Sequence, residues 1–185
     1  MNHLEIEYKT LLDKEEYQSL LPLFADTELV VQTNHYIDTP DQLMSKEKMA
    51  LRVRTFTDQA ELTLKVPEAV GHFEYNQNLS PEETEAILQH QQFPDGEIKN
   101  LLISKEIPVE QLAVWGSLTT ERFEKETAAG LVALDHSLYL DTEDYELEIE
   151  VETAEQEENF NQFIKEHGIV FKTAKNKIAR LAERL

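Results

Sequence analysis

Residues 145–152 read YELEIEVE and residues 4–9 read LEIEYK, so acidic and apolar side chains alternate along both stretches. A period of two places successive side chains on opposite faces of a β-strand. Each stretch therefore predicts a strand with one apolar face and one face of charged side chains. Other stretches repeat this alternation, which favours a mainly β protein.

Turn and capping residues extend this interpretation to the rest of the chain. Further strands are expected at 28–38, 50–57, 60–66, 72–79, 114–128, 131–136 and 138–141, with turns at Ser137 and Glu143-Asp144. Helices are expected at 13–24, from Ser80, at 154–167 and at 173–185, with an irregular helical stretch at 94–112. About eight mostly consecutive strands favour one α+β domain over residues 1–185, an antiparallel meander closed into a barrel or a deeply curved sheet.

Composition excludes several classes of function. The chain of 185 residues has 17 Lys plus Arg against 37 Asp plus Glu, a formal charge of −20, which disfavours binding to duplex nucleic acid or anionic membranes. Without cysteine, thiolate metal sites and disulfides are excluded, and carboxylate oxygens are the expected metal ligands. No signal peptide or membrane span is apparent, so we expect a cytoplasmic protein, either a monomer or a homodimer.

The charged strand faces allow two arrangements. They face water in an open sheet, or they line the interior of a barrel whose apolar outer faces are covered by helices. Apolar residues at helical spacing, Tyr17, Leu20 and Phe24 in one helix and Phe160 and Phe163 in another, need an apolar surface, which favours the barrel. Buried charges must be neutralised, so a barrel of this kind predicts a tunnel for a polyanion and a metal ion.

The charged residues themselves indicate phosphate chemistry. Two pairs of carboxylates at i, i+2 offer the hard oxygen ligands that Mg²⁺ or Mn²⁺ prefers: Glu5 with Glu7, and Glu148 with Glu150. Cations on the same strand faces are suited to phosphate oxygens: Lys9, Arg52, Arg54, Lys65 and Arg122. Any single pair is more often a solvated strand face, so only the combination is informative.

The residues that carry these charges also resemble a known family. Glu5-Ile6-Glu7-Tyr8-Lys9 is similar to the ExExK signature of the CYTH superfamily, the class IV adenylate cyclases and thiamine triphosphatases also called triphosphate tunnel metalloenzymes. The similarity continues in order through Tyr36-Ile37-Asp38-Thr39-Pro40, Leu51-Arg52-Val53-Arg54, Leu62-Thr63-Leu64-Lys65, Arg122, Leu134-Asp135 and Glu146-Leu147-Glu148-Ile149-Glu150. The resemblance implies a closed antiparallel eight-stranded barrel with flanking helices and a C-terminal plug helix.

The resemblance also implies roles for individual residues. The metal ligands would be Glu5, Glu7, Glu148 and Glu150, with Asp135 and Glu74 as further ligands. The triphosphate would be bound by Lys9, Arg52, Arg54, Lys65, Arg122, Lys177 and Arg180. Lys9 and Tyr36 would form a proton-handling pair, although a packed aromatic residue at Tyr36 is an equal alternative.

Two positions depart from the family pattern. The S-K-x-x-R motif expected on the plug helix reads Asn176-Lys177-Ile178-Ala179-Arg180, where Asn can still cap the helix. An Arg-x-Glu motif after Lys65 is replaced by His72-Phe73-Glu74, so one arginine is missing from that strand.

These observations predict metal-dependent hydrolysis of the terminal phosphate of a triphosphate. The substrate classes left open are inorganic triphosphate, thiamine triphosphate and a nucleoside triphosphate. The alternatives are an adenylate cyclase that uses the same groups, a non-catalytic sensor of triphosphates, and a structural protein that carries charge for solubility.

Overall fold

The computed structural model describes residues 1–185 and contains eight strands in a closed antiparallel barrel. The order of hydrogen-bonded neighbours around the barrel is β1-β5-β4-β3-β2-β6-β7-β8. The strands are β1 (His3–Leu12), β2 (Val30–Asp38), β3 (Ala50–Thr55), β4 (Ala60–Pro67), β5 (His72–Leu79), β6 (Ala113–Thr127), β7 (Gly130–Tyr139) and β8 (Thr142–Val151). The predicted eight-stranded barrel is therefore confirmed.

Short helices connect and flank the strands. They are α1 (Lys14–Leu20), α2 (Leu43–Lys46), α3 (Pro81–His90), α4 (Glu97–Ser104), α5 (Glu157–Glu166) and α6 (Lys177–Ala182), with 3₁₀ turns η1 (Leu21–Phe24), η2 (Val109–Gln111) and η3 (Ala154–Gln156). A membrane-spanning helix is absent, because none of these segments combines the necessary length with an apolar sequence.

The chain divides into two compact units. The first unit consists of Met1–Leu4 and Thr33–Ser117, and the second unit consists of Glu5–Gln32 and Leu118–Leu185. Each unit has its own apolar cluster and its own set of charged strand residues, so the two are described in turn.

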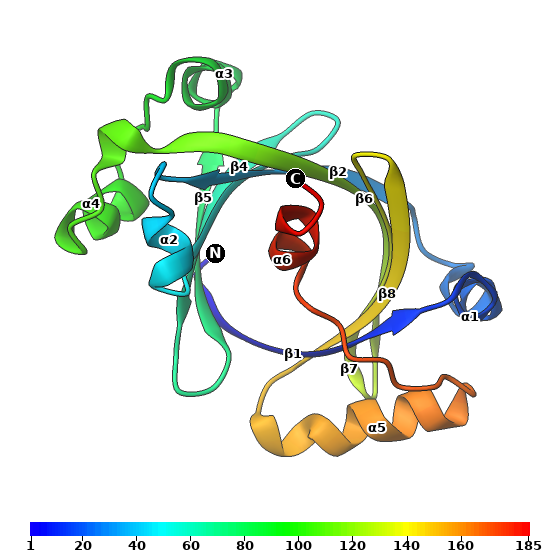
Figure 1. The fold of residues 1–185 in the computed structure, drawn as a ribbon. Coiled ribbons are helices and arrows are strands. Elements are labelled where there is room, and N and C mark those ends of the chain that lie inside the picture. The colour runs from blue at the N-terminus through cyan, green and yellow to red at the C-terminus, as the bar shows by residue number, and fades with distance from the viewer. The chain divides into compact units, whose positions relative to one another are not determined.

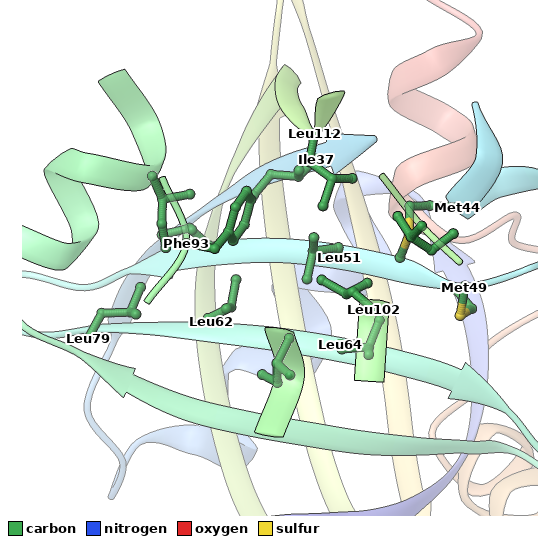
Figure 2. Close-up of a cluster of buried hydrophobic side chains, with 14 residues drawn as sticks. Ile37, Met44, Met49, Leu51, Leu62, Leu64, Leu79, Phe93, Leu102 and Leu112 are labelled. Atoms are coloured by element: carbon green, nitrogen blue, oxygen red, sulfur yellow. The ribbon is translucent and has the colours of Figure 1, made fainter. Parts of the chain in front are cut away.

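In the first unit, β2 to β5 form an antiparallel meander whose apolar face carries helices. Val53 lies opposite Leu62 and Leu51 opposite Leu64, so the apolar residues of β3 and β4 share one face. Side chains from the helices complete this cluster: Met44 from α2, Ile87 from α3, and Ile98 and Leu102 from α4. Figure 2 labels Met44 and Leu102 beside the leucines of β3 and β4. Each fully buried leucine contributes about 2 kcal/mol through loss of apolar surface to water.

In the second unit, β1 pairs with β8, and β8 pairs with β7, which pairs with β6. Leu134 and Leu147 lie opposite each other and are fully buried in an apolar cluster with Leu20, Phe24 and Phe160. The helices thus cover the apolar strand faces, as the apolar residues of the predicted helices require. In Figure 1, α5 and α6 lie on opposite sides of β1.

Two of the predicted helix starts are confirmed in detail. Asp13 caps α1 by accepting a hydrogen bond from the backbone N–H of Glu16 at 2.8 Å, and the Glu16 carboxylate accepts one from the N–H of Asp13 at 3.0 Å. Ser80 and Glu83 make the same reciprocal capping box at the start of α3. These bonds satisfy backbone donors that have no partner within the helix.

Two predicted turns are wrong. Residues 131–136 and 138–141 are not separate strands, because Ser137 lies within the continuous strand β7, opposite Thr120 and Asp144. Glu143-Asp144 is not a turn but part of β8, and the chain reverses at Leu140, which has a left-handed φ of 53°.

The two helices at the ends of the second unit are also shorter than predicted. The helix expected at 13–24 ends as α-helix at Leu20 and continues as the 3₁₀ turn η1, where Pro22 cannot donate an α-helical hydrogen bond. The helix expected from residue 173 begins only at Lys177, because Lys172 is held extended against β1. Its backbone N–H donates to the Thr10 hydroxyl at 2.9 Å, and its carbonyl accepts from the N–H of Leu11 at 3.2 Å.

Candidate functional site

The charged strand face of the second unit brings together most of the predicted metal ligands. Glu7 lies directly opposite Glu150 in the β1–β8 ladder, and Lys9 lies directly opposite Glu148. Directly paired residues share a face of the sheet with Cβ atoms about 5 Å apart. The Lys9 ammonium also donates to the Glu7 carboxylate at 3.1 Å, so acidic and basic groups alternate along this face.

A buried ion cluster lies beside this pair of strands. Arg122 on β6 binds Asp135 on β7 with two hydrogen bonds of 2.7 Å and binds Glu148 on β8 at 2.8 Å. Lys177 on α6 contacts the same two carboxylates, Asp135 at 2.8 Å and Glu148 at 2.7 Å. Four of the residues singled out from the sequence therefore meet in one cluster, and α6 lies against the charged face.

These contacts determine the ionisation of the cluster. Burial alone would raise the pKa of Asp135, but Arg122 and Lys177 hold that pKa below its usual value. The same two cations outweigh burial at Glu148 and hold its pKa well below the usual range. The pKa of Lys177 is held well above its usual value, because Asp135 and the neighbouring glutamates outweigh burial. Arg122, Lys177, Asp135 and Glu148 are therefore ionised groups that neutralise one another.

Glu146 belongs to this cluster and was not among the site residues chosen from the sequence. Its side chain is fully buried, it pairs with Arg180, and its Oε1 atom is buried with no hydrogen-bond partner. Burial raises the pKa of Glu146 to about 8, with Glu148 acting in the same direction and Lys177 against it. The period of two in residues 145–152 places Glu146 on the face of Glu148, and this was the signal that could have identified it.

The plug helix α6 is anchored by its own cap and by Arg180. Asn176 caps the helix by accepting a hydrogen bond from the N–H of Ala179 at 2.8 Å, so the Ser-to-Asn departure keeps the capping function. Arg180 is 8% exposed and contacts Asp144 at 3.1 Å, Glu146 and the Lys175 carbonyl at 2.7 Å. Its charged group is thus held by protein partners in this structure.

The acidic residues of β1 and β8 suit a divalent cation. Glu7 and Glu150 are like charges placed directly opposite each other, an arrangement that destabilises a sheet unless a cation offsets it. Carboxylate oxygens are the ligands that Mg²⁺ and Mn²⁺ prefer. Asp135, by contrast, is fully buried and engaged by Arg122 and Lys177, so its contacts favour a role in holding these cations.

The first unit carries the other predicted cations on β3 and β4. The Arg54 Nε atom donates to the Asn34 side chain at 2.8 Å, and an Arg54 Nη atom lies 4.0 Å from Glu61. Lys65 lies 3.6 Å from Glu74, another acidic residue predicted as a metal ligand. The Nε atom of Arg52 is buried and has no hydrogen-bond partner, which suits an arginine that binds an anion.

Tyr36 lies in the same unit and is almost fully buried at 2% exposure. Its ring stacks on Trp115 with centroids 5.9 Å apart, and its hydroxyl accepts a hydrogen bond from Asn34 at 3.3 Å. Tyr36 opposes Arg52 in the β2–β3 ladder, so it shares the charged face with that arginine. These contacts fit a packed aromatic residue, and a proton-handling role stays a prediction.

Fold and charge pattern together define a class of protein: a closed antiparallel eight-stranded barrel with acidic and basic side chains on the strand faces opposite the helices. A family model described as the CYTH domain matches residues 3–182, and the chain belongs to this family. The resemblance noted in the sequence is thereby confirmed over nearly the whole chain.

Individual relatives agree with this assignment. The chain is 37% identical over 183 residues to a Bacillus subtilis protein named "putative triphosphatase YjbK", covering 97% of this chain and 95% of that protein. The crystal structure of a "putative adenylate cyclase" from Bacillus halodurans is also 37% identical, with a TM-score of 0.91 and 97% of each chain covered. A Hippeastrum protein, described as a putative adenylyl cyclase with a dominant triphosphatase activity, shares the fold at 21% identity, with a TM-score of 0.84 over 98% of this chain and 96% of that chain.

Proposed function

We propose that this protein hydrolyses the terminal phosphate of a linear triphosphate with the help of a divalent cation. The observation that carries the proposal is the cluster of Arg122, Lys177, Asp135 and Glu148 beside the opposed carboxylates of Glu7 and Glu150. Carboxylates that can hold a metal ion, next to cations that can bind phosphate oxygens, are the groups that phosphoryl transfer requires.

The cations of the second unit would bind phosphate oxygens. Lys177 and Arg122 are each engaged with carboxylates, and a triphosphate would offer them oxygens of the same charge and similar geometry. Lys9 lies on the same face, opposite Glu148. We also propose phosphate-binding roles for Arg52, Arg54 and Lys65, supported in the case of Arg52 by its buried Nε without a partner.

The carboxylates would hold Mg²⁺ or Mn²⁺. We propose Glu5, Glu7, Glu148 and Glu150 as the ligands, with Asp135 and Glu74 as further residues that tune the site. A bound cation would supply charge neutralisation for the phosphate oxygens and favour an attacking water. Because Glu148 is engaged by Lys177 and Arg122, binding of a cation there would exchange one positive partner for another.

Names of relatives support hydrolysis and leave cyclisation as the second candidate. The Bacillus subtilis relative is named a triphosphatase, whereas the Bacillus halodurans relative of equal identity is named an adenylate cyclase. In the cyclase alternative, the same groups would direct a ribose hydroxyl to the α-phosphorus of ATP. In the sensor alternative, they would bind a triphosphate without turnover.

A substrate screen tests this proposal. Inorganic triphosphate, thiamine triphosphate, ATP and GTP are each incubated with Mg²⁺ or Mn²⁺, and orthophosphate, pyrophosphate and cyclic AMP are measured. We expect orthophosphate from at least one substrate, and a loss of about 100-fold in kcat/KM for Glu148→Gln because a charged partner of the reacting groups is removed. Arg54→Ala tests the first unit in the same assay, where we expect weaker substrate binding and a raised KM.

The matched control is Glu152→Gln, which removes the same charge from an exposed residue just beyond β8 and should leave the rate unchanged. Formation of cyclic AMP and pyrophosphate from ATP would favour the cyclase. Metal-dependent binding without turnover would favour the sensor, and unchanged hydrolysis in Glu148→Gln would contradict the proposal.

A further inference from the structure

Arg180 is held by three partners: Asp144, Glu146 and the Lys175 carbonyl. Its Nε atom contacts Asp144 at 3.1 Å, one Nη atom pairs with Glu146, and the other donates to the Lys175 carbonyl at 2.7 Å. The side chain is 9% exposed. Both Nη atoms are engaged by protein acceptors, and the Nε atom is buried with Asp144 as its ionic contact but without a hydrogen bond. The guanidinium is therefore held in place by Asp144, Glu146 and the Lys175 carbonyl.

Asp144 is itself held by a hydrogen bond within the β7–β8 hairpin. The hydroxyl of Tyr139, near the end of β7, donates to the Asp144 carboxylate on β8 at 2.7 Å. Burial and this bond to Asp144 raise the pKa of Tyr139, so the phenol keeps its proton and remains a donor. The chain of contacts therefore runs from the β7–β8 hairpin through Asp144 to Arg180 on α6.

The length of α6 explains why such an anchor is needed. The helix has six residues, Lys177–Ala182, and a helix of this length has little stability of its own in water. Its place against β7 and β8 must therefore come from tertiary contacts. Lys177 lies three residues before Arg180, so both side chains leave the same side of the helix.

We propose that Tyr139, Asp144, Glu146 and Arg180 form a latch that positions Lys177, and that Arg180 acts as a positioning residue. This α6 latch would hold the Lys177 ammonium at Glu148 and Asp135, 2.7 and 2.8 Å away. The proposal rests on the proposed function for its kinetic consequences. It differs from the expectation drawn from the family resemblance, in which Arg180 itself binds triphosphate.

A double-mutant cycle on Lys177 and Arg180 separates the two roles. Hydrolysis of inorganic triphosphate is measured for Lys177→Met, Arg180→Met and the double variant. If Arg180 acts through Lys177, each single variant loses about 10- to 100-fold in kcat/KM and the double variant is no worse than Lys177→Met. Multiplicative losses in the double variant would show that Arg180 contributes independently and would overturn the latch.

Asp144→Asn provides a second test, since the two roles predict opposite effects. The latch predicts that this variant loses activity in the same way as Arg180→Met, and that Tyr139→Phe does so to a smaller extent. If Arg180 bound phosphate, loss of the competing Asp144 charge would leave KM unchanged or lower it, which would contradict the latch. Arg184→Met is the matched control, because it removes an exposed cation from the chain just after α6 and should leave hydrolysis unchanged.

Amide hydrogen exchange tests the latch independently of catalysis. Peptides covering residues 175–185 should exchange at least about 10-fold faster in Arg180→Met and Asp144→Asn than in the unaltered protein, with no change in Arg184→Met. Unchanged exchange would overturn the latch, whether or not the protein hydrolyses a triphosphate. Faster exchange in a protein without hydrolysis would support the latch and contradict the proposed function.

Discussion

Glu146 and Glu148 lie two residues apart on β8 and share a face, yet their surroundings shift their pKa values in opposite directions. Burial raises the pKa of Glu146 to about 8, while Lys177 and Arg122 outweigh burial at Glu148 and hold its pKa well below the usual range. Two neighbouring carboxyl groups with such different proton affinities are often found where proton transfer is needed. Lys177 opposes the raised pKa of Glu146 and lowers the pKa of Glu148, and Glu148 has the additional contact with Arg122.

Among the charges of the cluster, we expect the removal of Asp135 to lower the free energy of unfolding most. Asp135→Asn would remove one of the two buried carboxylates that Arg122 and Lys177 share, leaving Glu148 to balance both cations, so the free energy of unfolding should fall by about 3–5 kcal/mol. Urea unfolding of the purified variant measures this loss.

The matched control for Asp135 is Glu124→Gln, which removes another carboxylate that contacts Arg122. Glu124 lies 3.7 Å from Arg122 and its side chain is 47% exposed, so its loss should cost less than about 1 kcal/mol. Equal losses of unfolding free energy in the two variants would contradict the interpretation that burial makes the ion pairs of Asp135 more costly to break.

Among the secondary-structure elements, α1 is tied to the segment before α6 by one carboxylate. Glu16 accepts hydrogen bonds from the Lys172 ammonium at 2.6 Å, from the Asp13 N–H at 3.0 Å and from the Val170 N–H at 3.0 Å. Burial opposes ionisation, but the bond from Lys172 and the two backbone bonds lower the pKa of Glu16 below its ordinary value of 4.5.

A lowered pKa in the folded state makes this contact sensitive to acid. The ionised form of Glu16 stabilises the fold above pH 4.5, and the contribution is lost as the pH falls through the lower folded pKa. At pH 7, Glu16→Gln should reduce the free energy of unfolding by about 1 kcal/mol, and this difference should shrink below pH 4.5.

Glu15→Gln is the control for Glu16, since it removes the same charge from an exposed residue in the same helical turn. Denaturation curves recorded across the pH range compare the two variants. A difference between Glu16→Gln and the unaltered protein that persists unchanged in acid would contradict the role of the ionised carboxylate.

For the whole molecule, the formal charge of −20 acts against the compact state. Several of the 17 Lys and Arg side chains, among them Lys177 and Arg180, are engaged in ion pairs within the second unit. Much of the acidic excess therefore lies on exposed positions, where the like charges repel one another. We therefore expect the midpoint of thermal unfolding to rise as NaCl is increased from about 20 mM to about 500 mM, because salt screens this repulsion.

Tetramethylammonium chloride at equal ionic strength is the control for the salt effect, because screening does not depend on which cation is present. A rise with both salts would confirm general screening, and a rise with only one would indicate specific ion binding. A fall in the midpoint would show that surface ion pairs outweigh the repulsion.

The fold was largely predictable because it depends on patterns that lie within short stretches of sequence. Alternation along residues 4–9 and 145–152 gave the strands and the face on which each charge lies, and the capping residues Asp13 and Ser80 gave helix starts. Boundaries failed where distant contacts decide them. Ser137 stays in β7 because both neighbouring strands pair with it, and Lys172 is kept extended by β1.

The sequence by itself determined which residues carry charge on which strand face, because side-chain direction in a strand follows from a period of two. Only the tertiary structure decided which charges meet. Lys177 lies 29 residues from Glu148 in sequence, and its pairing with Asp135 and Glu148 follows from the docking of α6. The engagement of Arg180 with Asp144 and Glu146 likewise depends on long-range packing, because burial and neighbouring charge are set by the folded chain and not by local pattern.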